Sequence, residues 1–291
     1  MKLTFLGTGT SHGVPVIACD CEVCKSKDPR DKRTRSAAYI ETNDNKYILI
    51  DIGPDFREQA LRENIRQIDA VLLTHSHADH LHGIDDLRNF SCIMSNKPDN
   101  PQNEKYARPP IPIYTNKATA QDIKNRFSYL FSAQADGGGH AKIQICDIAE
   151  FQSFHIGSAK ITEIPILHGK LKTSGWLLTE NQKSVAYLTD CNEIRETSFA
   201  HIKNLCAGGR LVHLIIDGLR IKPHSTHFNF QQALQAAANL NAEHVWFTHL
   251  THNSSHEQTQ AYLDEHRKDF PQLAQTKTIS PAYDGLVINT I

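Results

Sequence analysis

The chain has 291 residues, of which 40% are hydrophobic and 22% are charged, and its formal net charge is −1. This is the composition of an ordinary globular protein, long enough to bury a sizeable core. The lack of a basic excess argues against binding a long nucleic acid such as tRNA or duplex DNA. The sequence has neither the apolar run of a signal peptide nor a run of about 20 apolar residues, so we expect a cytoplasmic protein without membrane contact.

Short apolar runs predict the strands. They lie at residues 2–6, 37–42, 47–51, 68–73, 143–146, 160–166, 175–179, 184–189, 211–216, 243–247 and 285–290. Between the fourth and fifth runs, the proline-rich residues 95–112 predict a loop, because proline disrupts helix interiors and central strands.

Helix signals lie between some of these strands. One helix is expected to begin at Pro54, which suits a first helical turn. Its inward residues would be Phe56, Ala60, Leu61 and Ile65. Asn229 and Ser255 are expected to cap two later helices. Together the elements predict two sheets covered by helices.

Four of the apolar runs end on a residue that can bind a metal ion. These residues are His75, His168, Asp190 and His249. Rigid strands that deliver side chains to one edge are a good scaffold for a precise site. We therefore expect these four residues to converge.

The first of them opens the run His75-Ser76-His77-Ala78-Asp79-His80. Imidazole and carboxylate groups suit zinc, manganese or iron. Four ligands within six residues do not easily bind one ion, so the run favours two neighbouring metals. The alternative is the polar start of a helix with solvated histidines.

This run resembles that of the metallo-β-lactamase superfamily, and the resemblance extends over nearly the whole chain. It implies a four-layer αββα sandwich in a single domain, residues 1–291, and a ligand set at matching positions. By that resemblance His75, His77 and His168 hold the first metal, Asp79, His80 and His249 hold the second, and Asp190 bridges them. True β-lactamases of the superfamily have cysteine at the position of Asp190, so the chain resembles the dinuclear hydrolases instead.

Cys19, Cys21 and Cys24 place three thiols on one short loop. Structural zinc takes four ligands in a closed tetrahedron, so these cysteines need a fourth. We favour His252, three residues after His249, over His12. The alternative is three reduced surface thiols, which are a liability for an exposed loop.

The cysteine loop narrows the resemblance. Together with the start Gly7-Thr8-Gly9-Thr10 and with Gly13-Val14-Pro15, it is similar to the phosphoribosyl cyclic phosphodiesterase (PhnP) group. That group carries a structural zinc on three such cysteines and a histidine, and Thr248-His249-Leu250-Thr251-His252 matches its tail. The PQQ-biosynthesis relative PqqB has a similar cysteine loop.

A second pair of histidines, His224 and His227, precedes the helix capped by Asn229. Helix N-termini favour anions. The resemblance implies that His227 acts on the substrate, whereas His224 is left open between a substrate contact and a solvated loop. Asp51 ends a strand and can orient a ligating imidazole from behind, and Asp217 either does likewise or caps a turn.

The sequence therefore predicts a phosphodiesterase with two active-site divalent metals, Zn or Mn, and one structural Zn. Its nucleophile would be a metal-bridging hydroxide, and His227 and Asp79 would be its catalytic residues. The resemblance implies a small substrate such as phosphoribosyl 1,2-cyclic phosphate.

Three alternatives stay open at this point. They are a tRNA-processing type of nuclease, a thioester or lactone hydrolase, and a non-catalytic PqqB-like binding protein. The oligomeric state is not readable from the sequence, and a homodimer is one option.

Overall fold

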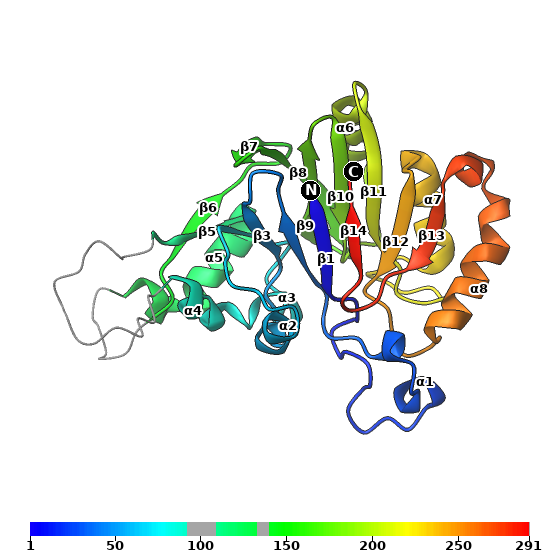
Figure 1. Cartoon of the computed structure of the whole chain (residues 1–291), viewed down its shortest axis with the longest axis horizontal. Coiled ribbons are helices and arrows are strands. Elements are labelled where there is room, and N and C mark those ends of the chain that lie inside the picture. Colours follow the sequence, from blue (N-terminus) through cyan, green and yellow to red (C-terminus); the bar gives the residue numbers. More distant parts are fainter. Residues whose placement is uncertain (92–108, 133–139, 291) are drawn as a thin grey trace.

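The computed structural model describes residues 1–91, 109–132 and 140–290. In this part of the chain two seven-stranded sheets lie face to face, and helices cover the outer face of each (Figure 1). The predicted helix–sheet–sheet–helix sandwich is confirmed.

The first sheet consists of strands from the N-terminal half and one strand from the C-terminal end. In spatial order they are β14 (Val287–Asn289), β1 (Lys2–Gly7), β2 (Ala37–Glu41), β3 (Tyr47–Ile50), β4 (Ala70–Leu72), β5 (Ile111–Thr115) and β6 (Ile143–Asp147). The last four run parallel to one another. Their carboxyl ends therefore lie along one edge.

The second sheet follows in the chain. In spatial order its strands are β13 (Thr278–Pro281), β12 (His244–Thr248), β11 (Arg210–Asp217), β10 (Lys183–Leu188), β9 (Leu171–Glu180), β8 (Ala159–His168) and β7 (Ser153–Ile156). Strands β10 to β13 are parallel, and β7 to β10 are antiparallel.

Helices of different lengths connect these strands. They are α1 (Glu22–Lys25), α2 (Phe56–Arg62), α3 (Ala78–Leu81), α4 (Arg88–Ser91), α5 (Lys117–Arg126), α6 (Glu196–Cys206), α7 (Phe230–Leu240) and α8 (His256–His266). Short 3₁₀ helices are η1 (Pro29–Asp31), η2 (Ile84–Leu87), η4 (Ser128–Phe131), η5 (Arg267–Asp269) and η6 (Pro271–Gln275). The predicted caps are confirmed, since Asn229 and Ser255 each form a capping box with the glutamine three residues later.

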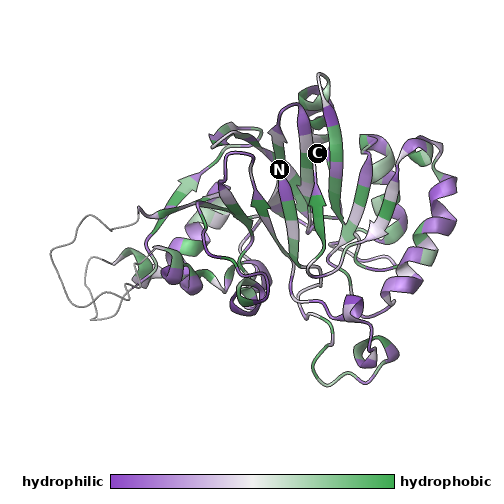
Figure 2. Ribbon diagram, viewed as in Figure 1, coloured by the Kyte–Doolittle hydropathy of each residue, from purple (hydrophilic) through white to green (hydrophobic). Residues whose placement is uncertain are grey.

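The core has three layers because side chains alternate along a strand. Ile48 and Ile50 of β3 pack between the two sheets, in one cluster with Trp176. Leu49, which lies between them in sequence, packs with Phe56 of α2 on the outer face. A third cluster joins the second sheet to α6, α7 and α8. In Figure 2 the strands are largely hydrophobic and the outer face of α8 is hydrophilic.

Three strands were not predicted, and they are β5, β7 and β13. The interpretation of residues 95–112 as a loop was wrong for the last residues of that range, because Pro112 lies inside β5, between β4 and β6. Residues 95–108 lie outside the described residues. Ile111 donates its N–H to Lys142 on the β6 side, so the nitrogen of Pro112 faces the other way. On that side pairing with β4 begins only at Ile113, and no ladder hydrogen bond is lost.

The prediction for the first long helix was also partly wrong. Asp55 precedes α2, which begins at Phe56 and not at Pro54, and Leu61 is 66% exposed. Leu61 lies five residues after the buried Phe56, which is a rotation of about 140° around a helix with 3.6 residues per turn. It therefore points away from the core.

Among the described residues, no helix has both the length and the apolar character that crossing a bilayer requires. The cytoplasmic location stays a prediction.

Replacement of the N-cap of α8 should weaken the fold measurably. Ser255→Ala removes the hydroxyl that accepts from the Gln258 N–H, and we expect the free energy of unfolding to fall by about 1 kcal/mol. Chemical denaturation of the purified protein measures this. Glu265→Ala, on the exposed side of the same helix, is the control, and an equal loss in both variants would contradict the capping role.

Candidate active site

Strand ends bring the predicted metal ligands together. His75 follows β4 by three residues, His168 ends β8, and His249 follows β12 directly. The ligand atoms form two groups, each within 4.8 Å, which are His75, His77 and His168 in one and Asp79, His80, Asp190 and His249 in the other. These groups match the two sets that the resemblance implied, with the expected bridging residue Asp190 grouped with the second set.

Asp190 lies between the two groups. Its Oδ2 is 3.8 Å from Nε2 of His75 in the first group and 3.3 Å from Nε2 of His80 in the second. Its Oδ1 is 3.2 Å from Nε2 of His249. The carboxylate is only 2% exposed, so the position suits a group shared by two cations.

The backbone is left-handed at three turns in this region. The φ angles are 60° at Asp51, 55° at Asp190 and 60° at His249. Non-glycine residues adopt this conformation rarely and at some energetic cost, and such residues concentrate at functional sites. Each of the three turns directs a side chain to the shared edge as the chain leaves its strand.

Hydrogen bonds from behind fix the imidazole rings. Asp51 accepts from Nδ1 of His80 at 2.7 Å and from the hydroxyl of Thr74 at 2.9 Å. Because that hydroxyl donates to Asp51, it accepts from Nδ1 of His75 at 3.0 Å. Nδ1 of His168 donates to the Thr226 carbonyl at 2.7 Å. Each Nδ1 thus holds the proton, and each Nε2 presents its lone pair to the centre.

The donor set fits divalent cations. Among the described residues, Nε2 of His75, His80 and His249 are buried without a hydrogen-bond partner. A buried polar atom in this state costs about 1–3 kcal/mol, and a cation between these nitrogens and the carboxylates would remove that cost. Two groups of nitrogen and oxygen donors, with Asp190 between them, are suited to two ions.

Charge in the site also favours cations. Burial raises the pKa of Asp190, but His249 and His80 outweigh it and hold that pKa well below its usual range. Burial keeps the pKa of His75 well below the ordinary histidine value, with a further lowering from His80. Asp190 is therefore ionised and His75 is neutral at neutral pH, which are the forms that bind metals.

His227 stands against both groups. Its ring centroid lies 4.4 Å from that of His168 and 4.6 Å from that of His249. Nδ1 of His227 bonds Oδ2 of Asp217 at 2.6 Å. Asp217 therefore orients His227, and the same oxygen also accepts the Cys191 N–H at 2.9 Å. Burial lowers the pKa of His227, but Asp217 outweighs burial and the net shift is upward.

His224 is exposed at the rim of the site. Its ring lies 5.3 Å from that of His227, and its Nδ1 accepts from the Thr226 N–H at 3.3 Å. Both histidines line a cavity of about 210 Å³, which also contains Arg220, His12 and His252. His224 thus lies beside His227 in this cavity without being one of the clustered ligands.

The cysteine loop forms a separate cluster. The sulfurs of Cys19, Cys21 and Cys24 lie 3.3, 3.4 and 3.4 Å from Nδ1 of His252. A tetrahedral zinc site with ordinary bond lengths requires sulfur–nitrogen separations of roughly 3.5 Å. Of the two histidines left open by the sequence, the structure brings His252 into the cluster; His12 does not belong to it.

A backbone hydrogen bond from Cys24 lowers the pKa of Cys21 to about 6, whereas burial raises the pKa of Cys24 to about 11. The Cys21 sulfur accepts the Cys24 N–H at 3.4 Å, and the Cys24 sulfur accepts the Val16 N–H at 3.3 Å. Such N–H groups stabilise thiolates around a metal.

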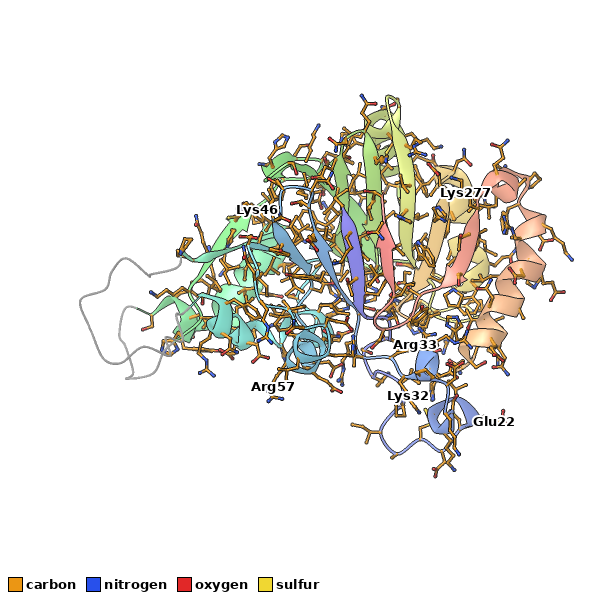
Figure 3. The ribbon with its side chains drawn as sticks, viewed as in Figure 1. Glu22, Lys32, Arg33, Lys46, Arg57 and Lys277 are labelled. Atoms are coloured by element: carbon orange, nitrogen blue, oxygen red, sulfur yellow. The ribbon has the colours of Figure 1, made fainter. Side chains whose placement is uncertain are left out.

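Arg33 anchors this loop to the body of the protein, where Figure 3 places it between the loop and the sheets. Its guanidinium donates to Thr8 at 2.9 Å and to the Ala282 carbonyl at 2.6 Å, and it is 4% exposed. Sequence reasoning missed Arg33 and the Thr226 carbonyl. A backbone carbonyl leaves no mark in a sequence, and one arginine in a charged loop is not distinctive.

Comparison with known proteins places the chain in a family. Residues 46–250 match the beta-lactamase superfamily domain. A crystal structure described as a new diphosphatase from the PhnP family is 35% identical, with a TM-score of 0.78 and coverage of 99% of this chain and 97% of that one. Zinc-bound PqqB from Methylobacterium extorquens is 18% identical with a TM-score of 0.75, and covers 99% of this chain and 100% of that one.

The curated relatives include an octanoyltransferase from Porphyromonas gingivalis, which is 33% identical over 98% of this chain. The chain spans about half the length of that protein, 51%. The two sandwiched sheets and the His/Asp clusters are those of a metal-binding hydrolase fold. Together with the domain match, they show that the chain belongs to the metallo-β-lactamase superfamily.

Proposed function

We propose that this protein is a dinuclear phosphodiesterase that acts on a small cyclic phosphodiester such as phosphoribosyl 1,2-cyclic phosphate. The observation that carries the proposal is the complete set of His and Asp ligands. The hydrogen-bonded pair of His227 and Asp217 lies next to this set. The similarity to a PhnP-family diphosphatase supports it. The aspartate at position 190, where β-lactamases of the superfamily have cysteine, argues against β-lactam hydrolysis.

Seven side chains would hold the two metals. His75, His77 and His168 would bind one, Asp79, His80 and His249 the other, and Asp190 both. When bound, two such ions lower the pKa of a water to supply a nucleophile and neutralise charge on phosphoryl oxygens. The Cys19, Cys21, Cys24 and His252 cluster would hold one structural zinc.

His227 would serve as the general acid. Its Nδ1 is engaged by Asp217, so Nε2 is left for the substrate. The upward shift of its pKa, caused by Asp217 against the effect of burial, keeps a proton available near neutral pH. A proton delivered to the departing oxygen avoids release of a high-energy alkoxide. His224, at the rim, would contact the phosphate or its substituent.

Loss of one proposed ligand should abolish activity. In His77→Ala we expect the hydrolysis of bis-p-nitrophenyl phosphate, measured with Zn²⁺- or Mn²⁺-loaded protein, to fall by at least about 100-fold. His82→Ala is the matched control, because His82 is exposed and lies outside both ligand groups. Equal rates in wild type and His77→Ala would refute the proposal.

The metal content should distinguish the two kinds of site. We expect three metals per chain by elemental analysis, and Cys21→Ser should lose one zinc and lower the melting temperature. Cys146→Ser is the control, since Cys146 is a free cysteine away from the cluster. Full zinc content in Cys21→Ser would show that the loop does not hold zinc.

The role of His227 predicts a dependence on the leaving group. His227→Gln should lower kcat by about 10²–10⁴-fold for a cyclic phosphate, whose leaving alkoxide needs a proton. The loss should be smaller for bis-p-nitrophenyl phosphate, because p-nitrophenolate leaves unprotonated. The same loss on both substrates would assign His227 to phosphate binding instead.

A thioester hydrolase is the second candidate, favoured by the octanoyltransferase similarity. About half of that relative lies outside the match, and the activity in its name can reside there. A hydrolase joined to acyl transfer would fit a thioester substrate. Turnover of octanoyl thioesters, but not of phosphodiesters, would favour this candidate over the first, and stoichiometric metal binding without turnover of any ester would favour a PqqB-like binding protein.

A further inference from the structure

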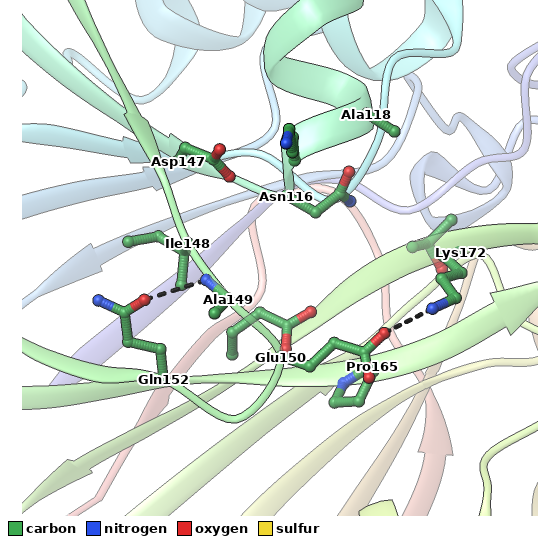
Figure 4. A pocket seen from close by; sticks show the side chains of 12 residues that line it. Asn116, Ala118, Asp147, Ile148, Ala149, Glu150, Gln152, Pro165 and Lys172 are labelled. Atoms are coloured by element: carbon green, nitrogen blue, oxygen red, sulfur yellow. Dashed lines mark hydrogen bonds and ion pairs between the residues drawn. The ribbon is translucent and has the colours of Figure 1, made fainter.

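A second cavity has a volume of about 610 Å³ (Figure 4). Its walls come from the start of α5, the segment after β6, and strands β8 and β9. None of the candidate metal ligands is among the described residues that line it. The function proposed above does not use this cavity.

The first wall continues the edge that carries the metal ligands. His75 follows β4, Asn116 follows β5, and Asp147 ends the parallel neighbour β6. Asn116 caps α5 and donates to the Ser174 hydroxyl at 3.3 Å. In α/β sheets, ligands bind outside the carboxyl ends of parallel strands, and the cavity has this position.

The second wall belongs to the hairpin that carries His168. Across the hairpin His168 pairs with Leu171, and Thr173 of the cavity lies two residues further, which is about 7 Å along a strand. The Thr173 hydroxyl donates to the Asp190 carbonyl at 3.2 Å. The hairpin therefore connects this wall of the cavity to the metal-binding edge.

Glu163 is the unusual residue in this wall. It shares a strand face with Ala159 and Ile161, which belong to the apolar core between the sheets. The carboxyl is 2% exposed, and one oxygen accepts the Phe151 N–H at 3.1 Å. Among the described residues, no lysine, arginine or histidine nitrogen forms an ion pair with it; Lys172, its neighbour in the cavity, pairs with Glu150 at 2.8 Å instead.

Burial raises the pKa of Glu163 to about 7 despite hydrogen bonds from the Phe151 N–H and the Ser174 side chain. A buried carboxylate without an ion pair is costly, and further hydrogen bonds to its charged form reduce that cost. N–H donors from a ligand would supply them.

We infer that this cavity binds the non-reacting end of the substrate, and this inference rests on the phosphodiesterase function proposed above. That end is a nucleobase whose two adjacent N–H groups donate to Glu163. Ile148 and Pro165, which also line the cavity, present apolar surface to the faces of a ring. Asp147 and Glu150 at the exposed rim argue against a second phosphate here. Guanine has the required N–H edge. Within the class of small cyclic phosphodiesters, the inference therefore replaces the phosphoribosyl example, which carries no base, by a guanine nucleotide.

The test compares guanosine 2′,3′-cyclic phosphate with bis-p-nitrophenyl phosphate, which lacks N–H donors. Glu163→Gln keeps the size of the side chain but replaces one acceptor by a donor. We expect the ratio of kcat/KM for the guanosine substrate to that for bis-p-nitrophenyl phosphate to fall about tenfold or more, through KM. Glu193→Gln, an exposed glutamate outside the cavity, is the control.

A second pair of variants blocks the space itself. Ala118→Trp on α5 fills the cavity and should lower the same ratio, whereas Gln121→Trp, exposed on the same helix outside the cavity, should not. An unchanged ratio in both Glu163→Gln and Ala118→Trp overturns the inference.

Calorimetry with guanosine on the metal-loaded protein separates this inference from the proposed function. We expect guanosine to bind wild type and the binding to weaken about tenfold in Glu163→Gln. If wild type hydrolyses neither phosphodiester, the proposed function fails, and guanosine binding still decides on the cavity. Absence of guanosine binding to wild type overturns the inference.

Discussion

The buried carboxylate of Asp51 is the point on which the metal-binding edge depends. It accepts the Thr74 N–H at 2.8 Å, the Thr74 hydroxyl at 2.9 Å and Nδ1 of His80 at 2.7 Å, and it is 0% exposed. Burying a carboxylate is favourable only when its oxygens are satisfied. The ends of β3 and β4 and the short helix α3 therefore have one compatible arrangement, which places His75 beside His80 with ring centroids 4.4 Å apart.

One short segment after β12 connects the two centres. His249 belongs to the candidate active site, and His252, three residues later, contacts the three cysteine sulfurs. Leu250 between them exchanges backbone hydrogen bonds with Thr8 and Thr10 at 2.9 and 3.1 Å. In the proposed function a metal at the cysteines would stiffen the wall of the cavity next to His227.

Periodicity predicted most of the fold, and its failures have local reasons. Pro112 lies inside a strand because its nitrogen faces a side where β4 has not yet begun to pair. Leu61 is exposed because only positions three and four residues after Phe56 share its side of α2. In both cases the residue type was known, but its direction depends on the neighbouring element, and a single sequence does not specify that element.

The sequence by itself determined the chemistry of the site: which strand ends carry imidazoles and carboxylates, and that three thiols share a loop. These are properties of side chains and of short spacings along the chain. The tertiary structure decided which groups meet, namely His252 instead of His12 with the cysteines, Asp217 with His227, and Glu163 with a cavity formed by α5 and β6. The physical reason is that these partners are separated by ten to more than two hundred residues, so only the pairing and stacking of the two sheets fixes the distances between them.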